Sequence, residues 1–409
     1  DRWDDMDRWG IKAWRYDQAG NAYLAPINDC TDERCPGEPK EDRITNYLIH
    51  NRYHHKLRNV FQKGGGTILD RVMITSLMKY NGRIAGAVGF SPDNDDTYIF
   101  QTKAIVLAAG NGGMKNCGIR TNTTTGDAQA MAYRIGCAVT GKEWADQHGS
   151  RGDFPAYPWT GNDRNPYYNK NDATCEHLWE HLPMYNMEGK KIVSDRPNLA
   201  KVHPLPFNAI AMAYEAHIGH APLFYKVDGN PDTSPMNHNP SDKPREEVDE
   251  LAAERGMVRM SMGRALGQSY HLSDGIWSDG TDCSTQVPGL FAAGDCLGAR
   301  SGYPMAGFAA AFCAVSGARA GVNAARFSDE HGWNGLDRDE IARLKGVLWG
   351  PKERKGGFTP QWALQVLQDV VTPYWVLLYK REDRLQAALN YIGFMRDHIV
   401  PQLMAYDNH

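Results

Sequence analysis

Short apolar runs in the first half of the chain have the length and spacing of β-strands. Residues 68–78 and 84–90 are two such runs, and they flank Asn81-Gly82, a dipeptide typical of a tight hairpin turn. Residues 98–110 contain a third run and then a buried fourth run, which ends at Ala109-Gly110. The pattern predicts a β-meander that leads into a parallel sheet.

A second patterned stretch lies at residues 287–321. It begins with a turn at Pro288-Gly289, continues with a buried strand at residues 290–293, and reaches a corner at Gly294-Asp295. A helix of small residues is expected from about Tyr303. The strand places Asp295 at the carboxyl end of a sheet, and the helix directs its free N–H groups to the same place. This predicts a site for a polar cofactor edge; the alternative is an ordinary buried strand followed by a helix.

Helical patterns appear in the middle and at the end of the chain. Thr125-Gly126-Asp127 predicts an acidic N-cap for a helix from about Ala128, and Gly136 is its stop signal. Short helices are also expected at residues 2–10 and 207–217. Residues 362–371 and 381–395 show helical periodicity; in the second, the apolar positions predicted to pack are Leu385, Ala388, Leu389, Ile392 and Met395.

Composition narrows the class of protein. A chain of 409 residues with 42% apolar and 23% charged residues is large enough for about two or three globular domains. A net charge of −4 argues against a nucleic-acid surface, and the longest small-residue run, 308–320, is too short for a transmembrane segment. Cys30 and Cys35 share one polar loop, where a local disulfide or two free thiols are favoured over a metal site. A reduced chain in the cytoplasm is expected.

The motif Gly-Leu-Phe-Ala-Ala-Gly-Asp at residues 289–295 resembles the second FAD-contacting motif of a known flavoprotein family. That family contains fumarate reductase, succinate dehydrogenase, L-aspartate oxidase and adenylylsulfate reductase. The resemblance implies FAD as cofactor, with one carboxylate on the ribityl chain and helix N–H groups on the flavin. Carried over position by position, the cofactor-binding residues are Asp295, Met305, Ala306, Asp127, Ala108, Ala109 and Gly110.

The resemblance also implies the fold class, α/β. We expect a doubly wound FAD-binding domain of the glutathione-reductase type, an inserted α+β capping domain and a C-terminal helical region. The flavin-binding domain would comprise residues 1–148 and 261–330, the cap residues 149–260, and the helical region residues 331–409, incomplete at its end. Residues 187–193 resemble a hairpin of the cap.

The same resemblance assigns the substrate-binding and catalytic residues. Arg300 stands where the family has an arginine that grips a substrate carboxylate, and a guanidinium suits a planar anion. His148 and His271 stand where it has two histidines. The family's proton-carrying arginine, which opens a helix of the cap, has no counterpart in residues 203–208 before the matching helix, where His203 is a candidate substitute. This departure argues against a dicarboxylate reaction by the usual route and leaves open an enzyme on the adenylylsulfate reductase side of the family or a relative of unassigned chemistry. A small anionic substrate and an iron–sulfur or other electron-transfer subunit are expected as partners, with membrane association only through them.

One signature of a dinucleotide site is missing. The sequence has no Gly-x-Gly-x-x-Gly after a strand, and Gly64-Gly65-Gly66 lacks the spacing. We therefore expect that roughly a hundred residues before Asp1, including this fingerprint, belong to the complete protein. The competing interpretation is a subunit that keeps the flavoprotein fold as a scaffold without FAD.

Overall fold

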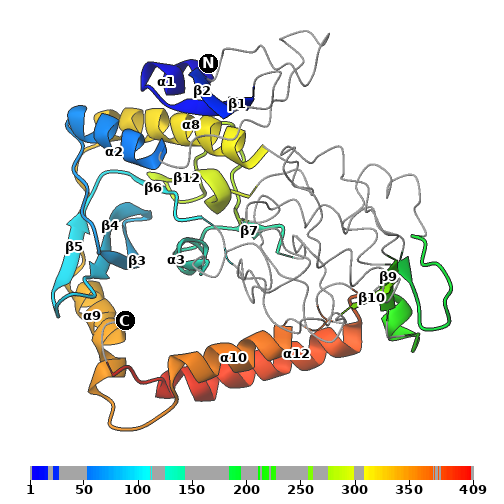
Figure 1. Ribbon diagram of the computed structural model, residues 1–409. Helices are drawn as coiled ribbons and strands as arrows, with labels where there is room; N and C mark the ends of the chain where they lie inside the picture. Colours follow the sequence, from blue (N-terminus) through cyan, green and yellow to red (C-terminus); the bar gives the residue numbers. More distant parts are fainter. Residues whose placement is uncertain are drawn as a thin grey trace.

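The computed structural model describes a large part of the chain, which Figure 1 draws in colour. The described residues are 2–16, 22–26, 53–110, 112, 125–142, 184–194, 211, 214–220, 223–226, 257–260, 275–298, 308–371, 373, 376 and 379–406.

Three strands form the predicted meander. The strands β3 (Met73–Tyr80), β4 (Arg83–Phe90) and β5 (Thr97–Gln101) pair antiparallel in the order β3-β4-β5. Asn81 and Gly82 both have positive φ, 48° and 77°, as the predicted hairpin turn requires. β3 begins later than residue 68, because Arg71 has φ 55° and its guanidinium binds the carboxylate of Asp93.

Two strands far apart in sequence form a parallel pair. β6 (Ile105–Leu107) lies beside β12 (Leu290–Ala292), with Ile105 opposite Leu290 and Leu107 opposite Ala292. The N–H of Ile105 donates to the carbonyl of Gly289 at 2.9 Å, and the N–H of Ala293 donates to that of Leu107 at 2.9 Å. The predicted parallel sheet is therefore present, and both strands run to the same edge.

The main core surrounds this pair. The helix α8 (Phe308–Glu330), yellow in Figure 1, contacts both strands. The helix α3 (Asp127–Arg134) contacts β3 of the meander. Buried side chains from the meander, the pair and both helices form one cluster, which includes Leu77, Ile84, Leu107, Met131, Ile276, Leu290, Phe291 and Ala320. Burial of this apolar surface fixes the sheet edge relative to α3 and α8.

Short elements at the beginning of the chain complete this part. The helix α1 (Arg2–Arg8) agrees with the expected short helix, and a hairpin of β1 (Lys12–Tyr16) and β2 (Ala22–Pro26) follows it. α1 contacts α8 (Figure 1). The helix α2 (Tyr53–Lys63) was not predicted, although Tyr53, Leu57, Val60 and Phe61 stand at helical spacing; it buries none of its residues.

Residues 184–260 contribute a small antiparallel sheet in the order β10-β9-β8, from β8 (Met184–Tyr185), β9 (Leu223–Lys226) and β10 (Met257–Met260). The expected hairpin is a tight turn at Asn186–Lys190 that follows β8. Residues 211 and 214–217 are helical, within the predicted segment.

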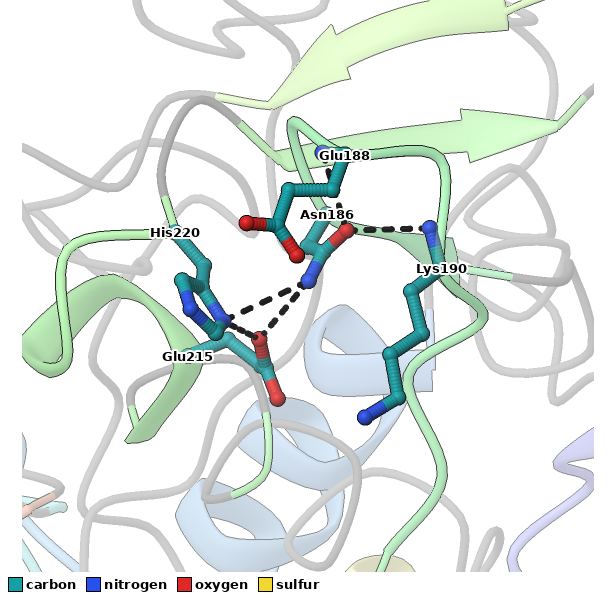
Figure 2. Close-up of polar contacts among 5 residues, drawn as sticks. All are labelled: Asn186, Glu188, Lys190, Glu215 and His220. Atoms are coloured by element: carbon teal, nitrogen blue, oxygen red, sulfur yellow. Dashed lines mark hydrogen bonds and ion pairs between the residues drawn. The ribbon is translucent and has the colours of Figure 1, made fainter.

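A polar cluster holds that turn against the helix end (Figure 2). Asn186 is 2% exposed, and its Oδ1 accepts from the backbone N–H groups of Glu188 and Lys190, each at 3.0 Å. Its Nδ2 donates to Glu215 Oε2 at 3.1 Å, and the same oxygen lies 2.7 Å from His220 Nδ1. Burial opposes ionisation of the Glu215 carboxyl, but the hydrogen bonds from His220 and Asn186 outweigh it and lower its pKa. The cluster satisfies its own polar atoms, as an anchor of the turn must.

The last part of the chain is helical, as predicted. α9 (Arg338–Glu353) packs Leu344 on Met78 and Val88 of the meander, and α10 (Pro360–Val371) lies beside α12 (Glu382–Phe394) in Figure 1. A π-helical turn (Met395–Ile399) and a 3₁₀ turn (Val400–Gln402) follow. Ala388 and Met395 are buried, but Leu389 is 61% exposed, so its predicted packing is wrong. Among the described helices, none combines the length and apolar character needed to cross a bilayer.

Two glycines join β11 (Gly275–Ile276) to the rest of this core. β11 pairs with β7 (Val139–Thr140), and the N–H of Gly298 donates to the carbonyl of Ile276 at 3.0 Å. A Cβ on Gly275 would lie 2.4 Å from the nitrogen of Gly298, and one on Gly298 would lie 2.4 Å from Thr140 Cγ2. Glycine at position 275 allows the two backbones to approach this closely, and glycine at position 298 leaves room for the side chain of Thr140.

Candidate cofactor site

The candidate site is the edge where β6 and β12 end. Ala108, Ala109 and Gly110 follow β6, and Ala293, Gly294 and Asp295 follow β12. Ala108 and Ala109 are exposed although they follow a buried leucine, and Asp295 is half-buried. Small side chains at the carboxyl ends of parallel strands leave room for a ligand, because ligands of open α/β sheets bind outside these ends. The two segments predicted to bind the cofactor thus meet at one place.

A 3₁₀ turn of Gly294–Cys296 forms the corner that carries Asp295. Gly294 has φ 61°, and its N–H donates to Ser316 Oγ of α8 at 2.9 Å; that hydroxyl donates to the carbonyl of Phe312 at 2.5 Å. Ser316 is buried, as is Cys296 on the corner itself. The serine therefore ties the corner to α8 and fixes the position from which the Asp295 carboxylate projects.

Cys313 lies beside this carboxylate, one helical turn before Ser316. Its Sγ donates to Asp295 Oδ1 at 3.9 Å. Although the residue as a whole is exposed, burial of the thiol and the negative charge of Asp295 raise its pKa from 9.0 to about 11. The thiol is neutral at physiological pH and serves as a reporter on the charge of Asp295.

This contact predicts slow alkylation of Cys313. With a pKa of about 11 instead of 9.0, the reactive thiolate at pH 8 is about 100-fold scarcer than for an ordinary cysteine. Iodoacetamide labelling of the Cys313 peptide, followed by mass spectrometry across pH, should rise towards pH 11. Asp295→Asn should accelerate labelling at pH 8, because it removes the neighbouring charge. Labelling of the wild type at the rate of free glutathione would contradict the contact.

The beginning of α3 differs from the sequence prediction. The N-cap is Gly126 in the left-handed conformation, φ 72°, and no side chain accepts a hydrogen bond from the first turn. The predicted acidic N-cap is therefore wrong: Asp127 is the first helical residue, and its Oδ2 instead contacts the hydroxyl of Thr125. A side chain caps a helix from the residue just before it, which normally has an extended backbone. Here that position is held by a left-handed glycine, which has no side chain. The carboxylate remains at the positive end of the helix dipole.

The chain beyond β6 passes close to this helix start. Gly112 forms an antiparallel bridge with Thr125, and a Cβ on Gly126 would lie 3.5 Å from the Cα of Gly112. The segment that contains Ala108–Gly110 therefore leads directly to the first turn of α3. Both α3 and the 3₁₀ corner also contact β11, so one short strand bridges the two carboxylate-bearing elements.

The structure places five of the ten predicted site residues. Ala108, Ala109 and Gly110 lie at the end of β6, Asp295 on the corner, and Asp127 in the first turn of α3. The other five lie outside the described residues, as do the predicted loop cysteines and the histidine considered for proton transfer: Arg300, His271, His148, Met305, Ala306, Cys30, Cys35 and His203.

Sequence reasoning missed two residues that contact the corner, Cys313 and Ser316, and one buried residue in the first turn of α3, Gln129. The first two stand three apart in α8, which places both on one face of the helix, and that spacing was the available signal. Gln129 gave none, because a glutamine in the first turn of a helix is ordinary. Within the described residues, no group of three or more His, Cys, Asp or Glu side chains is arranged to hold a metal.

Comparison with known proteins agrees with this geometry. Residues 2–146 match the family model described as FAD binding domain. Adenylylsulfate reductase from the hyperthermophilic Archaeoglobus fulgidus has the same fold, with a TM-score of 0.64 and 18% identity over 100% of this chain and 70% of that chain. Sdh1 of Mycobacterium smegmatis in complex with UQ1 has a TM-score of 0.67 and 18% identity, over 99% of this chain and 67% of that chain. A quinol-fumarate reductase with menaquinol molecules has a TM-score of 0.61 and 15% identity, over 100% of this chain and 71% of that chain. No curated protein matches the sequence.

The fold is that of the fumarate reductase-like flavoproteins, with a FAD-binding domain of mixed helices and strands. The predicted resemblance to the flavoproteins of fumarate reductase, succinate dehydrogenase and adenylylsulfate reductase is confirmed.

Proposed function

We propose that this protein is an FAD-dependent oxidoreductase flavoprotein that transfers electrons between its flavin and a small anionic substrate. The observation that carries the proposal is the meeting of Ala108–Gly110 and Asp295 at one sheet edge, joined by the parallel pairing of β6 and β12. The match of residues 2–146 to an FAD binding domain supports the same cofactor. The finer architecture belongs to the proposal: a doubly wound flavin-binding domain in residues 1–148 and 261–330, a capping domain in residues 149–260, and a helical region from residue 331.

The residues at the edge suit this cofactor. Exposed alanines after β6 allow the backbone to approach a bound adenosine, and Asp127 and Asp295 offer carboxylates that accept hydrogen bonds from hydroxyl groups. The Gln129 amide nitrogen in the first turn of α3, which has no partner among the described residues, also suits a site that a polar ligand completes. In this arrangement Asp295 would hold the ribityl chain, and the backbone N–H groups of Met305 and Ala306 the flavin edge. FAD supplies two-electron redox chemistry when bound.

Substrate binding is assigned to three residues. Arg300 would clamp an anionic group with its guanidinium, and His148 and His271 would bind the substrate from two other sides. The clamp orients the substrate against the cofactor, and the cap excludes water from the pair. Because residues 203–208, just before the matching helix, contain no arginine, we place the substrate outside the usual dicarboxylate route, with a sulfur oxoanion as the preferred class. His203 is the proposed proton carrier if a dicarboxylate is used. An iron–sulfur or other electron-transfer subunit is the proposed electron partner, through which the protein would associate with a membrane.

An absorption spectrum tests the cofactor. We expect the purified full-length protein, reconstituted with FAD and freed of excess by gel filtration, to retain the visible flavin bands and to lose them on reduction with dithionite. Reoxidation of the reduced protein by fumarate, adenylylsulfate or sulfite, added singly, would then identify the class of anion. A chain that retains no flavin at saturating FAD would refute the enzyme and favour a scaffold subunit that keeps the fold alone.

A further inference from the structure

One buried polar atom in the first turn of α3 has no partner. Gln129 is 3% exposed, and its Nε2 is the only buried side-chain nitrogen or oxygen among the described residues without a hydrogen bond. Buried amide donors are almost always paired, because leaving one unpaired costs the free energy of its lost hydration. An unpaired buried donor such as Gln129 Nε2 therefore points to a bound ligand that supplies the missing acceptor.

The orientation of this amide is fixed by its other end. Lys142 Nζ contacts Gln129 Oε1. Because an ammonium can only donate, the oxygen must face Lys142, and exchange of the two amide atoms is excluded. The unpaired donor is therefore Nε2, turned away from the lysine. Glutamine holds its two polar atoms in one rigid plane, so the lysine contact also limits where Nε2 can point.

The helix that carries this donor begins beside the candidate site. Gln129 is the third residue of α3, in a first turn whose N–H groups no side chain caps. Asp127 begins the same turn, and Gly112, just beyond the exposed end of β6, packs on Gly126 immediately before it. Ala128 and Met131, on the same helix, are buried in the main core, so α3 cannot turn to pair the amide elsewhere.

We propose that Gln129 is a further cofactor-binding residue, whose Nε2 donates a hydrogen bond to an acceptor atom on the adenosine half of bound FAD. The inference rests on the proposed function. It adds a donor to a site where Asp127 supplies an acceptor, so the two side chains of one helical turn would bind complementary groups. Binding of FAD would then complete the hydrogen bonding of the apoprotein core.

Two substitutions test the donor. Gln129→Leu removes both polar atoms, while Gln129→Glu keeps an oxygen for Lys142 and removes the donor. We expect each to weaken FAD binding about tenfold or more, measured by quenching of FAD fluorescence on titration with apoprotein. Gln129→Leu should also leave the melting temperature of the apoprotein unchanged or higher, because an unpaired buried donor is gone. The rise in melting temperature produced by FAD should shrink in both variants.

Gln386→Leu on the exposed face of α12 is the matched control, and its FAD affinity should equal that of the wild type. If the wild type binds FAD and both Gln129 variants bind it equally well, the inference is wrong while the proposed function stands. If Gln129→Leu fails to fold, the Gln129→Glu result decides. If the wild type itself binds no FAD, the proposed function fails first, and this inference fails with it.

Discussion

Gly275→Ala should destabilise the protein by about 1–3 kcal/mol and lower its FAD content. The added Cβ would lie 2.4 Å from Gly298 N, 2.6 Å from Leu297 C and 2.7 Å from Cys296 O, all of them backbone atoms. Backbone cannot rotate away as a side chain can, so β11 and the 3₁₀ corner must separate. Because that corner carries Asp295, the displacement reaches the candidate site. Urea unfolding would give the stability, and flavin absorbance after reconstitution would give the FAD content.

A second glycine provides the control for Gly275→Ala. Gly321 lies in the interior of α8, and a Cβ there meets no atom within 4 Å. Gly321→Ala is expected to stabilise the protein by about 0.5–1 kcal/mol, since alanine is the better helix former. The two substitutions add the same methyl group, so opposite signs would assign the Gly275 effect to its close contact. Equal stability of Gly275→Ala and the wild type would refute that contact.

Arg300→Ala should reduce kcat/KM by about 30-fold to several thousand-fold and leave the FAD content unchanged. Loss of one partner of a desolvated, hydrogen-bonded charge pair costs about 2–5 kcal/mol, and about 1.4 kcal/mol corresponds to a factor of ten in rate. Arg300→Lys should recover only part of the activity, because an ammonium keeps the charge but not the two-pronged geometry. The rates are measured with whichever anion reoxidises the reduced flavin.

Arg326→Ala is the control for the arginine clamp. Arg326 lies on the exposed surface of α8, where its Nη1 donates to Asn323 Oδ1 at 3.4 Å. Its removal should change neither turnover nor FAD content. Wild-type kcat/KM in Arg300→Ala would remove this residue from the substrate site. Loss of flavin in Arg300→Ala would instead assign the arginine to the cofactor.

Turn residues and short apolar runs correctly predicted the elements that depend on neighbouring residues alone. Asn81-Gly82 fixes a hairpin because both residues accept positive φ, and apolar runs on each side supply the paired strands. The corner at Gly294-Asp295 was predictable for the same reason, since glycine permits the left-handed turn there. The start of α3 was misjudged, because Thr125-Gly126-Asp127 fits either an acidic cap or a left-handed glycine before the helix. That choice depends on the packing of Gly112 against Gly126.

Apolar periodicity was a weaker guide in the last helices. It correctly located α10 and α12, and it correctly placed Ala388 and Met395 inside. It also placed Leu389 inside, although most of that side chain is exposed. A helical stripe shows which residues share a face, but the width of the buried part depends on the neighbouring elements.

The sequence by itself determined the strands of the meander, β6 and β12, the hairpin turn and the glycine–aspartate corner, because hydrophobic spacing and backbone preference act over a few residues. Only the tertiary structure decided that β6 lies beside β12, that Cys313 and Ser316 meet the Asp295 corner, and that the amide of Gln129 is buried without a partner. Each of these depends on contacts between segments far apart in the chain. Such contacts form by burial of shared apolar surface, which no single segment specifies.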